Sequence, residues 1–397
     1  MSRDPHAPPL SGVMILAGPY VSADLRASLR EHRLPVFCTS ADVDPAGLGP
    51  GLLDAAAATA LVRAGARVLT NSENALDWLV GAAAGTPLAA WVAACKDKAR
   101  TRELLRPLYP DFRFRTLATA ALPGWEPADM PFPFVIKPAV GFFSLGVHVV
   151  RDRDDWRRVQ GLLADDLAST RGQYPDSVLD PARLLVEEVI VGDEYAIDAW
   201  YDDDGRAVIT NILHHPFAHT ASVSDRVYTT SVALLTRWLH PFTTWLEEVG
   251  ALTGVRGMPV HVEVRVRPDG RIVPIEINPQ RYGGWCTTAD LARHAWGFDP
   301  YASFLRDERP DWPAVCRDRD DRSWSIVVLD NGTGVPGADV KGFDFDGLAA
   351  RFARVLDCRP VDWRRYPLFG FLFVETPAGR ESELAAILAD DLRAWLA

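Results

Sequence analysis

Residues 261–284 read HVEVRVRPDGRIVPIEINPQRYGG, and this stretch contains two runs in which apolar and polar residues alternate. Alternation with a period of two is typical of a β-strand that has one apolar and one polar face. Between the runs, Pro268-Asp269-Gly270 is typical of a turn. We therefore expect an antiparallel hairpin, whose polar positions are His261, Glu263, Arg265, Glu276 and Asn278.

The register of this hairpin decides whether its two glutamates meet. A four-residue loop, Pro268–Arg271, would place Glu263 opposite Glu276 and His261 opposite Asn278. Two carboxylates about 5 Å apart repel each other, and a divalent cation such as Mg²⁺ or Mn²⁺ would stabilise them. A three-residue bulged loop would shift the register by one residue and place the glutamates on opposite faces. The alternative without a metal is a hairpin with an ordinary solvated face.

Composition limits the class of protein. The chain has 397 residues, too many for one core, and a net charge of −11 without a cluster of Lys and Arg, which argues against a nucleic-acid partner. Its five cysteines are scattered, so we expect a reducing compartment and neither disulfides nor structural zinc. No apolar run reaches the length of about 18 residues that a membrane span needs, and the N-terminus does not resemble a signal peptide. We therefore expect a cytoplasmic protein without a membrane partner.

The N-terminal part alternates strand and helix. Strands are predicted at residues 13–17, 36–38 and 67–70, with a helix at 52–64, which together indicate a small parallel α/β domain. No GxGxxG follows the first strand, so the dinucleotide fingerprint is absent. A single helix is predicted over residues 87–106, and it carries Lys98. Without a binding role, Lys98 would lie on a solvated face of this helix.

A short apolar strand, residues 134–138, contains Lys137 and precedes a loop over residues 141–146. Glycines let backbone N–H groups approach an anion and a lysine supplies a point charge, so the segment could clamp a phosphate. The same glycines would also suit a plain hairpin. The candidate residues of the loop are Gly141, Ser144 and Gly146.

Further strands are predicted at residues 184–190, 194–201 and 207–212, and an amphipathic helix at 236–252. The irregular segment 214–228 contains three histidines without a spacing typical of zinc, so we expect an active-site or surface loop. Another helix is expected over residues 288–296. The C-terminal unit is predicted as strand 325–329, helix 345–356, strand 370–375 and helix 381–395, a structural cap or an oligomerisation element.

Four features now stand in order along the chain: Lys98 on a helix, Lys137 before a small-residue loop, an apolar strand with Glu187, Glu188 and then Glu194, and the Glu263/Glu276/Asn278 hairpin. Together they resemble the ATP-grasp superfamily, and more closely its carboxylate–amine ligases that join amino acids, over about residues 10–300. The resemblance implies an α/β fold with a Rossmann-like N-terminal domain (1–106), a lid subdomain (107–193), a catalytic subdomain with a Mg²⁺ site (194–312) and a C-terminal α/β cap (313–397).

The resemblance also implies roles for residues. Lys98 and Lys137 would contact the phosphates of ATP, and the 141–146 loop would fold over them. The adenine would be lined by Glu187, Glu188, Val189 and Ile190, and Glu194 would bind the ribose. Mg²⁺ or Mn²⁺ would be held by Glu263, Glu276 and Asn278. A substrate carboxylate would attack the γ-phosphate to give an acyl phosphate, and an amine would then displace phosphate.

The chain departs from the family near the second glutamate. Many relatives have an Arg four residues after it, where it steadies the acyl phosphate, but this position is Gln280 and an arginine follows at 281. We predict that Arg281 takes this role, with Arg265 as the alternative, and His261 and Lys137 complete the catalytic candidates. A homodimer is a family-based expectation. Alternative functions are an ATP-binding protein without ligase activity, or a kinase or carboxylase of this fold.

Overall fold

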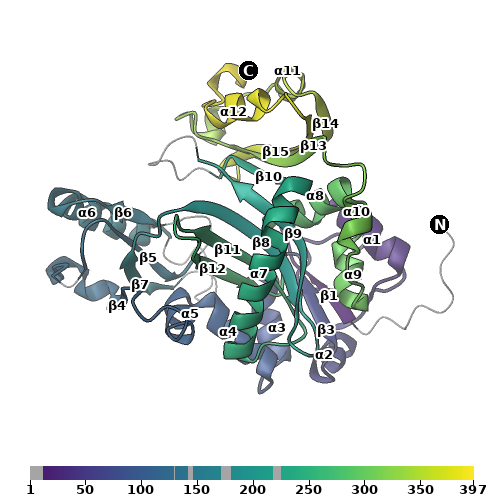
Figure 1. The fold of residues 1–397 in the computed structure, drawn as a ribbon, viewed down its shortest axis with the longest axis horizontal. Helices are drawn as coiled ribbons and strands as arrows, with labels where there is room; N and C mark the ends of the chain where they lie inside the picture. The colour runs from purple at the N-terminus through teal and green to yellow at the C-terminus, as the bar shows by residue number, and fades with distance from the viewer. Residues whose placement is uncertain (1–11, 129, 142–145, 171–179, 218–224) are drawn as a thin grey trace.

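The computed structural model describes residues 12–128, 130–141, 146–170, 180–217 and 225–397, and the strands in them form three sheets (Figure 1). The smallest sheet is parallel, with the order β2-β1-β3, and its strands are β1 (Gly12–Leu16), β2 (Val36–Cys38) and β3 (Arg67–Thr70). Helices α1 (Ala23–His32), α2 (Ala55–Arg63) and α3 (Leu76–Ala82) accompany it. The three predicted strands are confirmed, because a short continuous apolar run is typical of a strand covered on both faces.

The single helix predicted over residues 87–106 is wrong. The structure has α4 (Pro87–Lys96) and α5 (Lys98–Leu104), separated at Asp97, whose φ of −92° and ψ of 101° are not helical. The Asp97 side chain accepts hydrogen bonds from the backbone N–H groups of Ala99 and Arg100, so it caps α5. The break redirects the chain and makes Lys98 the first residue of a separate helix.

A four-stranded antiparallel sheet lies at one side of the molecule (left in Figure 1). Its order is β4-β7-β5-β6, with β4 (Phe114–Ala118), β5 (Phe134–Val140), β6 (His148–Val150) and β7 (Asp180–Glu188). Helix α6 (Arg153–Thr170) packs on it, with Trp156 against Phe134 at a ring-centroid distance of 5.8 Å.

The largest sheet has eight strands in the order β12-β11-β8-β9-β10-β13-β15-β14. Strands β8 (Asp193–Tyr201), β9 (Ala207–His215), β10 (Val227–Ser231), β11 (Met258–Val266) and β12 (Ile272–Pro279) form one half. Helix α7 (Val232–Thr253) covers one face of this half, where Phe242 and Trp245 pack with apolar strand residues such as Ile197 and Val262. The alternate residues of the same strands therefore belong to the opposite face.

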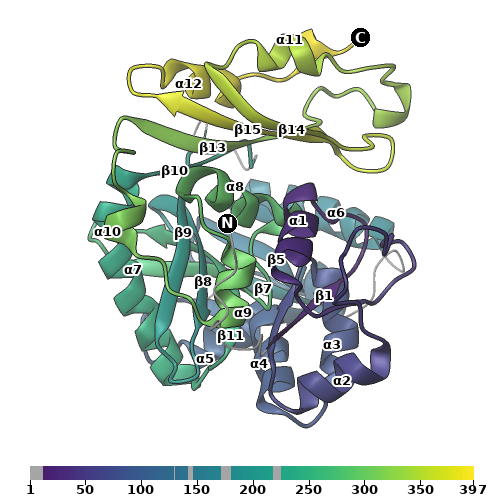
Figure 2. The ribbon, with the colours of Figure 1, turned by 90° about the vertical axis from the view of Figure 1, so that its right-hand side faces the viewer.

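The C-terminal strands continue this sheet: β13 (Arg322–Asp330), β14 (Arg354–Pro360) and β15 (Leu368–Pro377). Figure 2 shows them as an upper layer with α11 (Phe345–Ala349) and α12 (Ser382–Leu388) on the outer side. The helix predicted over residues 345–356 is therefore too long, because α11 ends at Ala349 and residues 354–356 belong to strand β14. The helix predicted over 381–395 likewise ends early, with α12. The domain boundaries stay a prediction.

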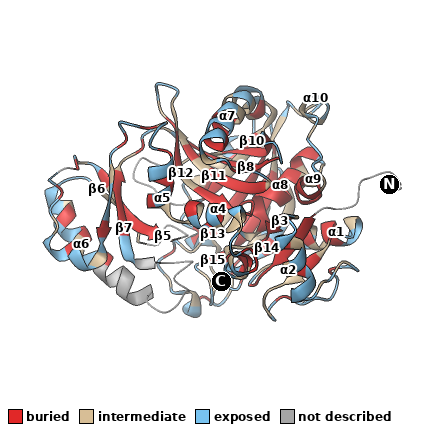
Figure 3. Ribbon diagram, turned by 90° about the horizontal axis from the view of Figure 1, so that it is seen from below, coloured by how far each residue is buried: buried red, intermediate tan, exposed pale blue. Residues whose placement is uncertain are grey.

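Helices α8 (Thr287–Trp296), α9 (Pro300–Arg306) and α10 (Trp312–Val315) join the two halves of the large sheet. Strand β9 continues through His215 and β10 begins at Val227, so the predicted 214–228 loop is shorter, and residues 218–224 of it lie outside the described residues. Figure 3 shows that β8 and β11 are mostly buried, whereas α6 carries much exposed surface. Among the helices of the described residues, none is long and apolar enough to span a membrane.

Candidate active site

The central hairpin is formed by β11 and β12. Glu263 pairs with Glu276 and His261 pairs with Asn278, so the predicted register is confirmed for these residues. The predicted loop is wrong, because Val266 pairs with Ile272 and the turn spans residues 267–271. Near the turn the register is therefore displaced by one residue. A β-bulge, in which Ile275 has no partner on β11, restores it before the two glutamates.

Neighbouring strands extend the polar positions of the hairpin into rows across the sheet. Arg265 pairs with Glu194 on β8, which pairs with His215 on β9. His261 pairs with Asp198 on β8. Because side chains alternate between faces, these residues and the two glutamates share the face opposite α7.

The Glu276 carboxylate already has a cation beside it. Its Oε2 lies 2.8 Å from Nζ of Lys98, and its Oε1 accepts a hydrogen bond of 2.8 Å from Nδ2 of Asn278. Burial alone would raise the pKa of Glu276, but Lys98 and the Asn278 hydrogen bond hold it below its usual range. Lys98 also donates to the carbonyl of Gly141, 2.8 Å away. Helix α5 thus brings the first predicted phosphate ligand to the predicted metal ligands.

His261 lies between two carboxylates. Its Nδ1 is 2.7 Å from Oδ1 of Asp198, and its Nε2 is 3.6 Å from Oε1 of Glu263. Burial alone would lower the pKa of His261, but the two carboxylates raise it to about 9. The imidazole is therefore a cation at neutral pH and holds Glu263 from one side. A quarter of the Glu263 side chain remains exposed.

Lys137 on β5 and Arg102 on α5 share one carboxylate. Glu187 on β7 lies 2.7 Å from Nζ of Lys137 and 2.6 Å from Nε of Arg102. Burial alone would raise the pKa of Glu187, but the two cations lower it to about 2. The pKa of Lys137 is lowered by burial, which Arg102 reinforces and Glu187 only partly offsets. Glu187 is an internal partner of Lys137, and its place at the adenine stays a prediction.

Glu188, Val189 and Ile190 lie at the junction between the four-stranded and the eight-stranded sheet. The Ile190 carbonyl accepts a hydrogen bond of 2.7 Å from Arg265, and Glu188 accepts one of 3.2 Å from the backbone N–H of Arg113. These contacts fix the segment between the two sheets, and its place at the adenine stays a prediction.

Glu194 is held by two neighbours in its row. Its carboxylate lies 3.0 Å from Nδ1 of His215 and 2.9 Å from Nε of Arg265. Burial alone would raise the pKa of Glu194, but these partners lower it. Arg265 is bound to Glu194 and to the carbonyl of Ile190, and its alternative role at the acyl phosphate stays a prediction.

Arg281 reaches the N-terminal unit. Its NH2 lies 2.5 Å from Oε1 of Glu73, which also pairs with Lys96. Burial alone would raise the pKa of Glu73, but Arg281 and Lys96 lower it to about 2. Arg281 also lowers the pKa of Glu276, so its charge acts on the predicted metal ligands. The arginine after Gln280 therefore lies near the site, and its catalytic role stays a prediction.

Sequence reasoning missed several partners. Arg102 follows Lys98 by four residues on α5, and this spacing could have indicated one common face. Glu73 was not predicted as a site residue, Asp198 was predicted only as a strand residue, and His215 only as part of the 214–228 loop. Gly146 has a φ of 67°, which suits glycine, whereas Ser144 of the same loop lies outside the described residues.

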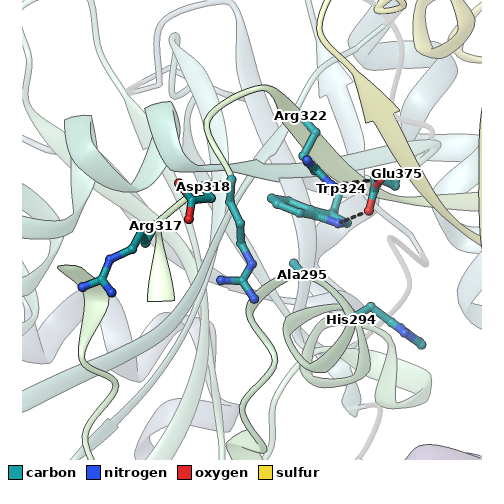
Figure 4. A pocket seen from close by; sticks show the side chains of 8 residues that line it. His294, Ala295, Arg317, Asp318, Arg322, Trp324 and Glu375 are labelled. Atoms are coloured by element: carbon teal, nitrogen blue, oxygen red, sulfur yellow. Dashed lines mark hydrogen bonds and ion pairs between the residues drawn. The ribbon is translucent and has the colours of Figure 1, made fainter. Parts of the chain in front are cut away.

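A cavity of about 390 Å³ lies elsewhere, between α8, the segment after α10 and strands β13 and β15 (Figure 4). In Figure 4, Glu375 contacts both Arg322 and Trp324, with the indole Nε1 at 3.2 Å from the carboxylate. The cavity shares no residue with the predicted site. Its lining residues are His294, Ala295, Arg317, Asp318, Arg319, Arg322, Trp324 and Glu375.

Comparison with known proteins agrees with this geometry. Residues 130–289 match the sequence profile of the ATP-grasp domain. This part of the chain is an ATP-grasp domain. It runs from just before β5 to the start of α8, and therefore contains the predicted metal ligands and Lys137 but not Lys98 or Glu73.

Solved structures share the fold over nearly the whole chain. An L-amino acid ligase from Bacillus licheniformis is 17% identical, with a TM-score of 0.65 and coverage of 96% of this chain and 97% of that one. A carboxyaminoimidazole ribonucleotide synthase from Aspergillus clavatus, complexed with ATP, is 13% identical, with a TM-score of 0.65 and coverage of 97% and 100%. A biotin carboxylase from Campylobacter jejuni is 13% identical, with a TM-score of 0.61 and coverage of 94% and 89%. The ATP-grasp architecture predicted from sequence is confirmed.

Among curated proteins, the chain is similar to the uncharacterized protein y4rH of Sinorhizobium fredii (strain NBRC 101917 / NGR234). The two are 26% identical over 271 residues, which are 63% of this chain and 52% of the relative. The chain thus spans about half the length of this relative.

Proposed function

We propose that the chain is an ATP- and Mg²⁺-dependent ligase that joins the carboxylate of an amino acid to an amine and releases ADP and phosphate. The observation that carries the proposal is the pairing of Glu263 with Glu276, beside Lys98, on a sheet of an ATP-grasp domain. The similarity in fold to an L-amino acid ligase supports the choice of substrates.

The proposed nucleotide site lies along the polar residues that are paired across neighbouring strands of the sheet. Lys98 and Lys137 bind phosphate oxygens, and the backbone at Val189 and Ile190 binds the adenine. Glu194, held by His215 and Arg265, accepts hydrogen bonds from the ribose hydroxyls. Phosphoryl transfer depends on position and charge neutralisation more than on covalent help from the protein, and these residue types supply both.

The residues also fit a divalent cation. Glu263, Glu276 and Asn278 offer oxygen donors on two paired strands, and Glu276 forms an ion pair with the Lys98 ammonium group in this structure. A Mg²⁺ ion held there would neutralise the phosphates of ATP as charge shifts during transfer. Protonated His261 orients Glu263 from the side, because Asp198 fixes the other imidazole nitrogen.

The proposed reaction has two steps. A carboxylate oxygen of the first substrate attacks the γ-phosphorus, the bond to the bridging oxygen breaks, and an acyl phosphate and ADP form. The amine, after losing its extra proton, attacks the acyl carbon, and phosphate leaves with the bonding electrons. In this proposal Arg281 stabilises the negative charge of both steps, since a guanidinium binds phosphate and carboxylate oxygens in pairs.

The test is release of phosphate and ADP from ATP and Mg²⁺ by the full chain, with amino acids offered singly and in pairs. Release that needs both a carboxylate and an amine supports the ligase. Release of AMP and pyrophosphate contradicts it and indicates adenylation. A stable phosphorylated product formed without an amine indicates a kinase of the same fold.

A further inference from the structure

Each cation predicted at the nucleotide site already contacts a carboxylate. The ion pairs, with the shortest N–O distance of each, are Lys98–Glu276 (2.8 Å), Lys137–Glu187 (2.7 Å), Arg265–Glu194 (2.9 Å) and Arg281–Glu73 (2.5 Å). The charges of the site are thus balanced within the chain. A ligand that breaks one of these ion pairs must therefore supply a new partner both for the cation and for the carboxylate.

The Lys98–Glu276 pair differs in what it joins. It connects a residue predicted to bind phosphate with a residue predicted to bind the metal, and the two side chains are only 12% and 20% exposed. The Lys98 ammonium nitrogen lies 2.8 Å from the Glu276 carboxylate oxygen, on the side where this carboxylate would contact a metal ion.

The backbone that carries Lys98 is fixed. Asp97 caps α5 through the N–H groups of Ala99 and Arg100, and it also pairs with Arg183 on β7 at 2.5 Å. A change of partner by Lys98 therefore needs rotation of its side chain and no movement of the helix.

We propose that Lys98 is a placeholder for the divalent cation: it holds Glu276 until a metal–nucleotide complex arrives, and then transfers to a phosphate while Glu276 binds the metal. The exchange rests on the proposed function only for the positions of nucleotide and metal. No covalent bond is made or broken: Lys98 exchanges Glu276 for a phosphate, and the metal ion gains Glu276.

This exchange predicts that cation and nucleotide bind together better than either binds alone. A free divalent ion that takes Glu276 leaves the Lys98 ammonium without its partner in a mostly buried position, which is costly. A free nucleotide that takes Lys98 leaves Glu276 bare opposite Glu263. The metal–nucleotide complex satisfies both groups, and such reciprocal coupling commonly amounts to about 5- to 150-fold in affinity.

The experiment measures Mn²⁺ affinity of the full chain by calorimetric titration, with and without a non-hydrolysable ATP analogue. The variant is Lys98→Met, and the matched control is Arg100→Met, which removes an exposed cation from the same helix. Without nucleotide, Lys98→Met should bind Mn²⁺ at least about fivefold more tightly than the unchanged chain. With the analogue the order should reverse, with Lys98→Met about tenfold weaker. Arg100→Met should match the unchanged chain in both titrations.

Equal or weaker Mn²⁺ binding by Lys98→Met without nucleotide would overturn the placeholder. Lys98→Gln is the second variant should the methionine protein not fold, with the same expected order. Adding Glu276→Gln to Lys98→Met should remove the gain. If the gain persists, the ion does not bind at Glu276, and the proposed metal site fails as well. The titration uses no carboxylate or amine, so absence of an amide product would contradict the ligase proposal separately.

Discussion

Replacing Glu187 by glutamine would remove the carboxylate that two buried cations share. Arg102 and Lys137 both contact it, and their side chains are 5% and 6% exposed, with Glu187 itself at 3%. Glutamine has nearly the same shape, so the change removes charge without leaving a cavity. The two cations would then repel each other without a counter-ion.

The magnitude follows from two independent routes. The pKa of Glu187 is lowered from an ordinary 4.5 to about 2. At about 1.4 kcal/mol for each pH unit, this difference amounts to about 3 kcal/mol of folding stability. Removal of one partner from a buried ion pair typically costs about 3–5 kcal/mol. We therefore expect Glu187→Gln to lower the free energy of unfolding by about 3 kcal/mol at pH 7.

The assay is urea unfolding at several pH values, with Glu188→Gln as the matched control. Glu188 is the next residue on β7, but its carboxylate is 24% exposed and lies 3.6 Å from Arg267. An ion pair of that kind contributes about 0–1 kcal/mol. The comparison of the two variants separates the buried cluster from the general loss of one acidic residue.

The sign of the pH dependence is a second check. A carboxyl whose folded pKa is depressed contributes its full stability above the unfolded value of about 4.5, and loses it as the pH falls toward 2. The difference between the unchanged chain and Glu187→Gln should therefore shrink between pH 5 and pH 2.5. A loss below about 1 kcal/mol at pH 7, or a difference that does not change over this range, would refute the buried charge cluster.

Three further changes test the site and its frame. Glu276→Gln should lower ADP release at least about 100-fold, because charge neutralisation at the transition state is lost; it should also lower the free energy of unfolding, because Lys98 loses its partner in a mostly buried pair. Glu73→Gln releases Arg281 from its partner and should lower kcat about tenfold while KM for ATP is unchanged in steady-state assays. Gly192→Ala, at a φ of +145°, would place its Cβ 2.1 Å from the Val266 carbonyl and should lower the free energy of unfolding by about 2 kcal/mol or more.

The hairpin shows what an alternating pattern can and cannot predict. The pattern indicates that each strand has one apolar and one polar face, but it leaves open whether Glu263 and Glu276 share the polar face; in the structure they are paired. It contains no information on the loop, where a displacement of one residue near the turn is cancelled by the bulge at Ile275. The predicted metal ligands lie close together because the burial of the apolar face specifies the register more strongly than the turn does.

Local propensity failed where tertiary contacts decide. The segment from residue 345 to residue 356 contains many helix formers, yet α11 ends at Ala349 and the chain pairs with β15 from Arg354 onward, because strand pairing at a sheet edge outweighs a weak preference. The break at Asp97 could have been predicted, since aspartate is a preferred N-cap. The partners Glu73–Arg281 and Arg102–Glu187 are far apart in sequence, and no local pattern specifies them.

The departure at Gln280 is resolved by backbone conformation rather than by side-chain type. Gln280 has a φ of 63°, and its backbone is held from two sides, with its N–H donating to Pro259 and its carbonyl accepting from Thr70. A left-handed residue reverses the direction in which the next side chain leaves the strand. Arg281 consequently points toward Glu73, while the Gln280 amide is buried without a hydrogen-bond partner among the described residues. A count of residues from the second glutamate is therefore not sufficient here, because one residue with a positive φ changes where the next arginine side chain lies.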